Sequence, residues 1–136
     1  IMRGFDDVFF APHSRYGEVP LELLNKESDL ITISGSDEVG AYLMQNQSGT
    51  RVFITGHPEY DRATLHDEYV RDLESGLAPD IPVNYYPHND PKKEPLKSWQ
   101  AHGYLLFSNW LNYNVYQKTP YNLSQVSENV RTDNFA

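Results

Sequence analysis

The imidazole of His57 and the carboxylate of Glu59 lie two residues apart and together have the chemistry of a general base. A histidine takes up a proton near neutral pH, and a neighbouring carboxylate can fix its tautomer and stabilise its charged form. In an extended backbone, side chains at positions i and i+2 point the same way. Such a pair supplies two members of a nucleophilic triad, but it can equally be a structural hydrogen bond at a strand end. The flanking Gly56 and Pro58 fix the backbone, and both interpretations stay open.

Arg71 and Ser14 are further candidates, each with a plain alternative. The Arg71 guanidinium could hold a substrate carboxylate, whereas its spacing favours an ordinary surface pair with Asp67. Ser14 follows a predicted strand end, where its hydroxyl could contact a substrate or simply belong to a loop.

Two other groups of residues indicate no additional binding site. The five histidines match no metal-ligand spacing, so we expect no metal site. Helical spacing and negative charge assign four aromatic residues to the core rather than to a base-stacking surface. These residues are Trp99, Tyr104, Phe107 and Trp110.

Alternating apolar runs and turn residues predict the elements that position these side chains. We expect strands over residues 8–10, 30–33, 39–44 and 52–54, the last of them buried, with a locally antiparallel or mixed pairing. Helices are predicted over 20–25 and 61–75, the second closed by Gly76, and from Ser98 to about Pro120 as a well-buried helix. Residues 78–97 form a proline-rich loop, packed on the body by Tyr85 and Tyr86. His57 would then follow the carboxyl end of a strand, where open α/β sheets bind ligands.

Composition narrows the class of protein. A length of 136 residues suits one domain, and a net charge of −8 argues against nonspecific nucleic-acid or anionic-membrane binding. We find no apolar run that would span a bilayer and no signal peptide, and we expect a polar tail over 124–136.

The absence of cysteine excludes disulfides, thiolate metal sites and a cysteine nucleophile within these residues. The start at Ile1, with Met2 second, suggests a piece of a longer protein.

Five segments together resemble the C-terminal part of MetA-type homoserine O-acyltransferases, from about residue 3 to about residue 123. They read RGFDD (3–7), APHSR (11–15), GHPEYD (56–61), NYYPHNDP (84–91) and LLFSNWLNY (105–113). The resemblance implies an α/β, flavodoxin-like fold, a three-layer sandwich like that of class I glutamine amidotransferases, of which this chain is the C-terminal portion. Residues 1–123 would belong to the acyltransferase domain.

The resemblance also implies an activity, the transfer of an acyl group from acetyl-CoA or succinyl-CoA to L-homoserine in methionine biosynthesis. A cysteine thiolate would accept the acyl group and pass it on by a ping-pong mechanism. His57 would be the general base, supported by Glu59, while Arg71 and Ser14 would contact the substrate. We expect acyl-CoA as a co-substrate and no other cofactor, a cytoplasmic location and a homodimer.

The nucleophilic cysteine lies upstream of these segments in the family, as does the residue that sets the acyl preference. We therefore expect this chain alone to be inactive, and we favour acetyl transfer because acetyl-CoA users form the larger part of the family. Three alternatives remain: L-serine as the acceptor, a glutamine-amidotransferase-like hydrolase, and a non-catalytic scaffold. The motif over 105–113 counts against the hydrolase.

Overall fold

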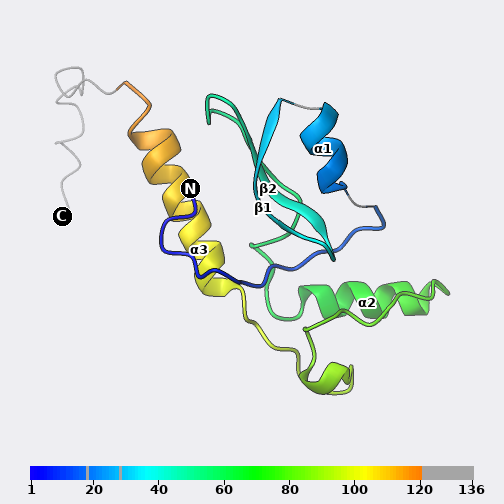
Figure 1. Cartoon of the computed structure of the whole chain (residues 1–136). Coiled ribbons are helices and arrows are strands. Elements are labelled where there is room, and N and C mark those ends of the chain that lie inside the picture. Colours follow the sequence, from blue (N-terminus) through cyan, green and yellow to red (C-terminus); the bar gives the residue numbers. More distant parts are fainter. Residues whose placement is uncertain (18, 28, 121–136) are drawn as a thin grey trace, which may run out of the picture.

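The computed structural model describes residues 1–17, 19–27 and 29–120, which form a small α/β structure (Figure 1). In chain order its elements are α1 (Leu21–Glu27), β1 (Leu30–Ser36), β2 (Gly40–Asn46), β3 (Val52–Ile54), α2 (Thr64–Glu74), the 3-10 turn η1 (Pro87–Asn89), α3 (Gln100–Asn109) and its π-helical continuation η2 (Trp110–Tyr116). None of the helices in these ranges combines the length and the apolar character that crossing a membrane requires.

The three strands form one antiparallel sheet in the order β1-β2-β3, which confirms the predicted antiparallel arrangement. A tight turn joins β2 to β3, where the N–H of Gly49 donates to the carbonyl of Asn46 at 2.9 Å. Gly49 has a φ of +67°, a conformation that favours glycine. The central strand β2 is covered on both faces, since its side chains from Ala41 to Met44 are all buried.

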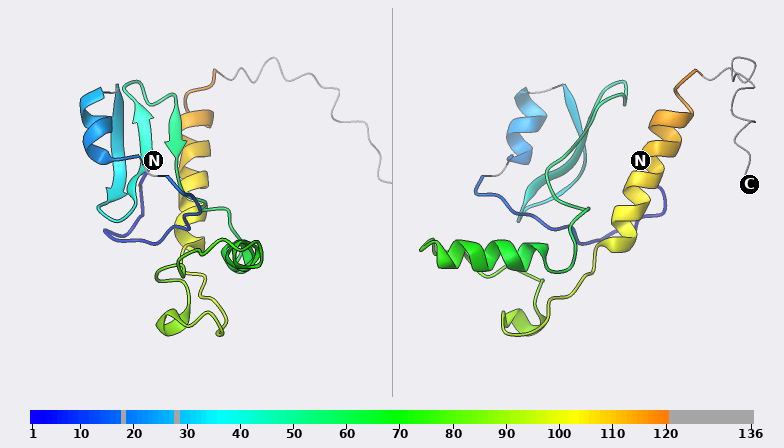
Figure 2. Two further views of the ribbon diagram at one scale, coloured as in Figure 1. Left: turned by 90° about the vertical axis from the view of Figure 1, so that its right-hand side faces the viewer. Right: turned by 180° about the vertical axis from the view of Figure 1, so that it is seen from behind.

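Two hydrophobic clusters hold the elements together. In the first, Tyr42 and Leu43 of β2 pack against Leu106 of α3, which runs beside the β3 side of the sheet (Figure 2). The second cluster comprises Tyr85, Tyr86 and Trp99, and the partly buried Tyr60 and Leu65 pack against it. This second cluster ties the loop before α3 to the start of α2, as predicted for the two tyrosines.

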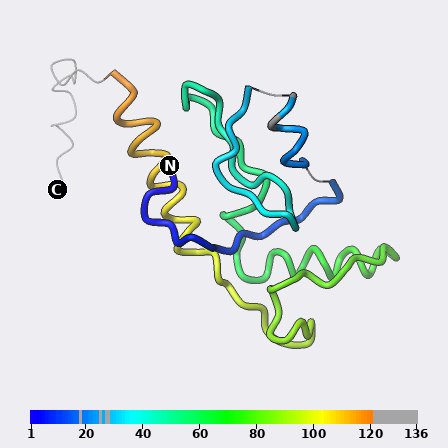
Figure 3. The backbone as a smooth tube through the Cα atoms, viewed as in Figure 1, coloured from blue at the N-terminus to red at the C-terminus, as the bar shows by residue number. Residues whose placement is uncertain are grey.

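The N-terminal segment runs from α3 past the sheet to α1 (Figure 3). The side-chain amide of Asn109 fastens its start by donating to the carbonyls of Ile1 and Arg3 at 2.7 and 2.8 Å. The predicted strand over residues 8–10 is wrong, because no ladder forms there. Phe9 instead packs edge-on against Phe5 and Tyr42, with ring centroids 4.9 and 5.5 Å apart. Aromatic packing therefore accounts for Phe9, whereas Val8 and Phe10 are exposed.

Helix α2 begins three residues later than predicted, at Thr64 instead of Asp61. The residue before it, Ala63, occupies the N-cap position and makes no side-chain hydrogen bond to the helix. The helix ends at Glu74, one residue before the predicted end, and Gly76 closes it as predicted, since Gly76 takes the left-handed conformation at φ +76° and its N–H donates to the Leu73 carbonyl at 3.1 Å. The shift leaves residues 55–63 as an irregular segment between strand and helix.

Two burial predictions are wrong. The strand β3 is only partly buried, with Phe53 exposed. The helix formed by α3 and η2 ends at Tyr116 and buries only Gly103, Leu106 and Asn109 among its described residues. Trp99 is buried as expected, whereas Tyr104, Phe107 and Trp110 are exposed. The predicted polar tail over 124–136 lies outside the described residues.

Candidate active site

The backbone that carries His57 is pinned from both sides. Beyond β3, the N–H of Thr55 donates to Tyr42 at 3.0 Å, and the N–H of His57 donates to the carbonyl of Pro12 at 2.8 Å. Gly56 lies between these two bonds, and a Cβ there would be 2.8 Å from both the Pro12 carbonyl and the Tyr42 ring. Only glycine allows this close approach, which sets His57 at the carboxyl end of the strand.

His57 and Glu59 form the contact that their spacing predicts. Nδ1 of His57 lies 2.9 Å from Oε1 of Glu59, with side-chain exposures of 35% and 56%. The backbone between them is a turn rather than a strand, because the N–H of Tyr60 donates to the His57 carbonyl at 3.2 Å. An ionised carboxylate only accepts hydrogen bonds, so it holds the proton on Nδ1 and leaves Nε2 as the basic nitrogen.

Tyr60 is a central residue of the site that the sequence reasoning missed. Its ring stacks on His57 with centroids 4.3 Å apart and an interplanar angle of 16°. Its hydroxyl donates to Oε1 of Glu68 at 2.8 Å. Burial and the Glu68 hydrogen bond raise the pKa of Tyr60 to about 12, while a hydrogen bond from Ser14 acts in the opposite direction. Tyr60 therefore stays protonated and brings His57, Ser14 and Glu68 together.

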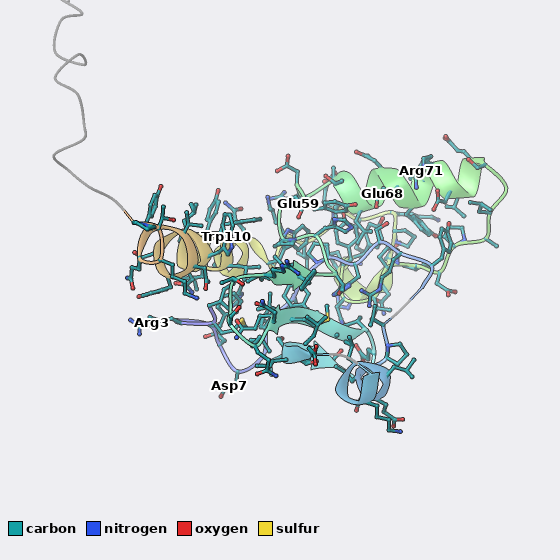
Figure 4. All side chains as sticks on the ribbon, turned by 90° about the horizontal axis from the view of Figure 1, so that it is seen from above. Arg3, Asp7, Glu59, Glu68, Arg71 and Trp110 are labelled. Atoms are coloured by element: carbon teal, nitrogen blue, oxygen red, sulfur yellow. The ribbon has the colours of Figure 1, made fainter. Side chains whose placement is uncertain are left out.

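Glu68 presents a carboxylate oxygen that lacks a partner. While Oε1 accepts from Tyr60, Oε2 is buried and has no hydrogen-bond partner among the described residues. An ionised oxygen taken out of water without a donor is costly. Figure 4 shows Glu68 and Arg71 in succession along α2, with Glu59 in the segment before the helix. Glu68 thus offers a negative site one helical turn before Arg71.

Arg71 forms an ion pair other than the predicted one. Its Nε and Nη2 atoms lie 2.9 and 2.8 Å from Oδ1 of the adjacent Asp72, and its side chain is 63% exposed. The expected pair with Asp67 is therefore wrong. Asp72 also accepts a hydrogen bond at 3.0 Å from Tyr16, which follows the loop that carries Ser14. Hydrogen bonds from Arg71 and Tyr16 lower the pKa of the Asp72 carboxyl.

The four predicted site residues are thus connected unequally. His57 and Glu59 are in direct contact, and Ser14 reaches them through Tyr60. Arg71, on α2, forms its hydrogen bond and ion pair with Asp72 rather than with His57. Tyr60 and Glu68 are the two residues that the sequence analysis missed, although their positions gave weak indications of a role. Tyr60 lies within the motif that contains His57, and Glu68 precedes Arg71 by one helical turn.

His13 is a third residue to which the sequence analysis assigns no role. It lies beside Gly56 and packs edge-on against Tyr42 at 5.7 Å, and its Nδ1 atom is buried without a hydrogen-bond partner. Burial, together with the nearby Arg15 and His57 charges, lowers the pKa of His13 to about 4. A neutral imidazole near His57 therefore adds no positive charge to the site at neutral pH.

Within the described ranges, no group of three or more histidine, aspartate or glutamate side chains is placed to hold a metal ion. The arrangement is that of a histidine, its carboxylate partner and neighbouring polar side chains, and the chain supplies no cysteine nucleophile.

Comparison with known proteins agrees with the resemblance seen in the sequence. The family model for homoserine O-succinyltransferase matches residues 1–121. The homoserine O-succinyltransferase of Pseudoalteromonas translucida is 54% identical over 136 residues, which are 100% of this chain and 43% of that relative. The Vibrio atlanticus protein of the same name is 56% identical over 135 residues, 99% of this chain and 42% of the relative. A third, from Photorhabdus laumondii, is 54% identical over 127 residues, 93% of this chain and 41% of the relative. The chain spans less than half the length of these relatives.

Proposed function

The chain belongs to the homoserine O-succinyltransferase family, and we propose that it supplies the general-base and acceptor-binding half of a homoserine O-acyltransferase. The observation that carries this proposal is the His57–Glu59 hydrogen bond of 2.9 Å at the carboxyl end of β3. A cysteine outside the chain supplies the nucleophile. The reaction is the acylation of the homoserine hydroxyl in methionine biosynthesis.

His57 acts twice in this scheme. Nε2 first takes the proton of the cysteine thiol, and the thiolate attacks the acyl-CoA carbonyl. The carbon–sulfur bond to CoA breaks, and the departing thiolate takes the proton from His57. Nε2 then takes the proton of the homoserine hydroxyl, whose oxygen attacks the acyl-cysteine and releases the cysteine thiolate, which regains that proton. Glu59 stabilises the imidazolium at each step.

The two charges of the acceptor amino acid match two groups on α2. Arg71 uses Nε and Nη2 for Asp72, which leaves donors of the guanidinium fork for a substrate carboxylate. The unpartnered Oε2 of Glu68 suits a substrate ammonium group, which would satisfy it with a charge-assisted hydrogen bond. The Ser14 hydroxyl lies beside Tyr60 and is available to the same substrate. We propose that these three residues orient L-homoserine.

We propose succinyl-CoA as the acyl donor. The relatives are named for succinyl transfer, and the acetyl preference expected from the sequence gains no support from them. In the family the residue that sets this preference lies outside the matched motifs, so these 136 residues do not decide it.

The remaining features of the expected enzyme are part of the same proposal. The antiparallel sheet would be one end of a larger flavodoxin-like, three-layer sandwich. The enzyme would need no cofactor besides acyl-CoA and would be a cytoplasmic homodimer. The chain alone, lacking cysteine, would form no acyl-enzyme.

The test is CoA release by a fused polypeptide, in which this chain replaces the matching 43% of the Pseudoalteromonas translucida relative. The fusion is given L-homoserine or L-serine with succinyl-CoA or acetyl-CoA. We expect release with L-homoserine and succinyl-CoA. Release with acetyl-CoA alone would overturn the donor, release with L-serine alone would overturn the acceptor, and hydrolysis of L-glutamine without acyl transfer would overturn the reaction. In parallel, mass spectrometry of this chain after incubation with succinyl-CoA should show no added acyl group.

A further inference from the structure

The outer edge of β3 is unpaired in the part of the chain that the structure describes, where the sheet ends in the order β1-β2-β3. On the β2 side, the N–H of Thr55 donates to Tyr42 at 3.0 Å and the N–H of Asn46 donates to Arg51 at 3.1 Å. Antiparallel ladders alternate residue by residue between groups that face the partner strand and groups that face away. The backbone N–H and C=O groups of Val52 and Ile54 therefore face the open edge.

A cavity of about 460 Å³ lies beside that edge, between β3 and α3. Apolar side chains dominate its lining, with Val52, Ile54 and Leu106 on its inner wall and Phe107 and Trp110 toward solvent. Phe107 and Trp110 are 42% and 41% exposed. An unpaired strand edge next to an exposed apolar surface is a template for adding another strand.

The same surface explains why the burial predictions for α3 and β3 are wrong. The sequence pattern puts apolar residues around much of the helix, as in an element covered on several sides. The described chain covers only one of those sides, through Leu106. The helix carries the pattern of a buried element next to a surface that nothing in the described residues covers.

The length of the relatives identifies the occupant. This chain corresponds to 43% of the Pseudoalteromonas translucida relative, so more than half of that relative has no counterpart here. We propose that a β-strand of that remaining part hydrogen-bonds to the β3 edge at Val52 and Ile54, and that its side chains fill the cavity between β3 and α3. We call this surface the β3–α3 docking face. The proposal rests on the proposed function in one respect: the docked part is taken to be the part that carries the nucleophilic cysteine.

The alternation of the β3 amides allows a residue-specific test. The remaining part of the Pseudoalteromonas translucida relative is produced as a separate polypeptide and added to this chain. Amide hydrogen exchange is then measured by NMR at residues 52, 53 and 54. We expect exchange at Val52 and Ile54 to slow at least tenfold on addition, while Phe53, already bonded across the sheet, changes far less. Binding without slower exchange at Val52 and Ile54, or no binding between folded parts, would overturn the proposal.

A matched pair of variants locates the contact. Trp110→Glu places a charge on the docking face, whereas Val83→Glu places one at a 72% exposed position in the loop after α2. Sedimentation should show binding weakened at least tenfold by Trp110→Glu and unchanged by Val83→Glu. Equal effects of the two variants would contradict the proposal. Slow exchange at Val52 and Ile54 in a self-associated form of this chain alone would assign the face to a second copy and also contradict it.

The fused polypeptide covers the case in which the separate parts do not fold. There, Val52 and Ile54 should exchange as slowly as Phe53, and fast exchange at Val52 and Ile54 would overturn the proposal. Activity separates the two ideas. Slow exchange without CoA release contradicts the proposed function alone, and CoA release with fast exchange contradicts the docking face alone.

Discussion

The Tyr60 hydroxyl donates a hydrogen bond to Oε1 of Glu68 at 2.8 Å. Because the Tyr60 ring also stacks on His57, this bond links the histidine turn to the helix that carries Arg71. It occupies one oxygen of Glu68 and leaves the other, Oε2, buried without a partner. His57, the proposed base, and Glu68, a proposed acceptor-binding group, are therefore both in contact with one tyrosine.

Tyr60→Phe in the fused polypeptide should raise the KM for L-homoserine by about tenfold with a smaller effect on kcat. The substitution keeps the stacked ring and removes one hydrogen bond to a charged group, worth about 1.5–3 kcal/mol. Steady-state kinetics with L-homoserine as the varied substrate provide the measurement. Tyr104→Phe, at an exposed tyrosine on α3, is the control and should leave KM unchanged. An effect on kcat alone would show that Tyr60 does not orient Glu68.

Arg71→Ala and Glu68→Gln should each raise the KM for L-homoserine by about tenfold or more, through loss of a charge-assisted contact. Formation of the acyl-enzyme from succinyl-CoA should continue at its normal rate, because that half-reaction does not involve the amino acid. Burst-phase CoA release separates the two steps. Arg62→Ala, an exposed arginine just before α2, is the control. Slower acyl-enzyme formation in Arg71→Ala would contradict the assignment.

Gly56→Ala should destabilise this chain by about 1–3 kcal/mol, the usual range for overpacking. The added Cβ would lie 2.8 Å from the Pro12 carbonyl and from the Tyr42 ring, and neither can yield without moving the strand. Urea unfolding followed by circular dichroism measures the change. Gly17→Ala, where a Cβ meets nothing within 4 Å, is the control and should change stability little. Equal stability of the two variants would show that the His57 turn is not tightly packed.

The stability of this chain should fall as the pH drops from about 6.5 toward about 4, partly because of His13. Its pKa is lowered to about 4 in the folded chain from the ordinary 6.5. Between those values the unfolded chain binds more protons at this site than the folded chain, so the free energy of unfolding rises with pH. Replacing His13 with Gln should flatten that slope relative to the unsubstituted chain in urea titrations at pH 4.5, 5.5 and 7. His88→Asn, at an exposed histidine, should keep the slope, and an unchanged slope in His13→Gln would contradict the prediction.

The parts of the fold and site that local sequence determines were predictable. The contact between His57 and Glu59, the turn at Gly49 and the helix end at Gly76 each depend on a few neighbouring residues. The extended segment at residues 8–10 was mistaken for a strand because pairing depends on a neighbour that local sequence does not name. The role of Tyr60 between His57 and Glu68 depends on how a turn meets a helix, which spacing alone does not determine.

The exposure of the aromatic residues of α3 and η2 was not predicted, for a different reason. Their spacing predicts burial, and the described chain provides no surface that covers Phe107 and Trp110. Burial is a property of the whole assembly, whereas an apolar pattern is a property of the segment.

The role of His57 as the general base is tested most directly by CoA release from the fused polypeptide and its His57→Ala variant, with succinyl-CoA and L-homoserine. The unsubstituted fusion should release CoA, and His57→Ala should release it about 10²–10⁴-fold more slowly, the range for loss of a general base. His88→Asn should retain the unsubstituted rate. Near-normal release by His57→Ala would contradict the assignment of the base and, with it, the central claim.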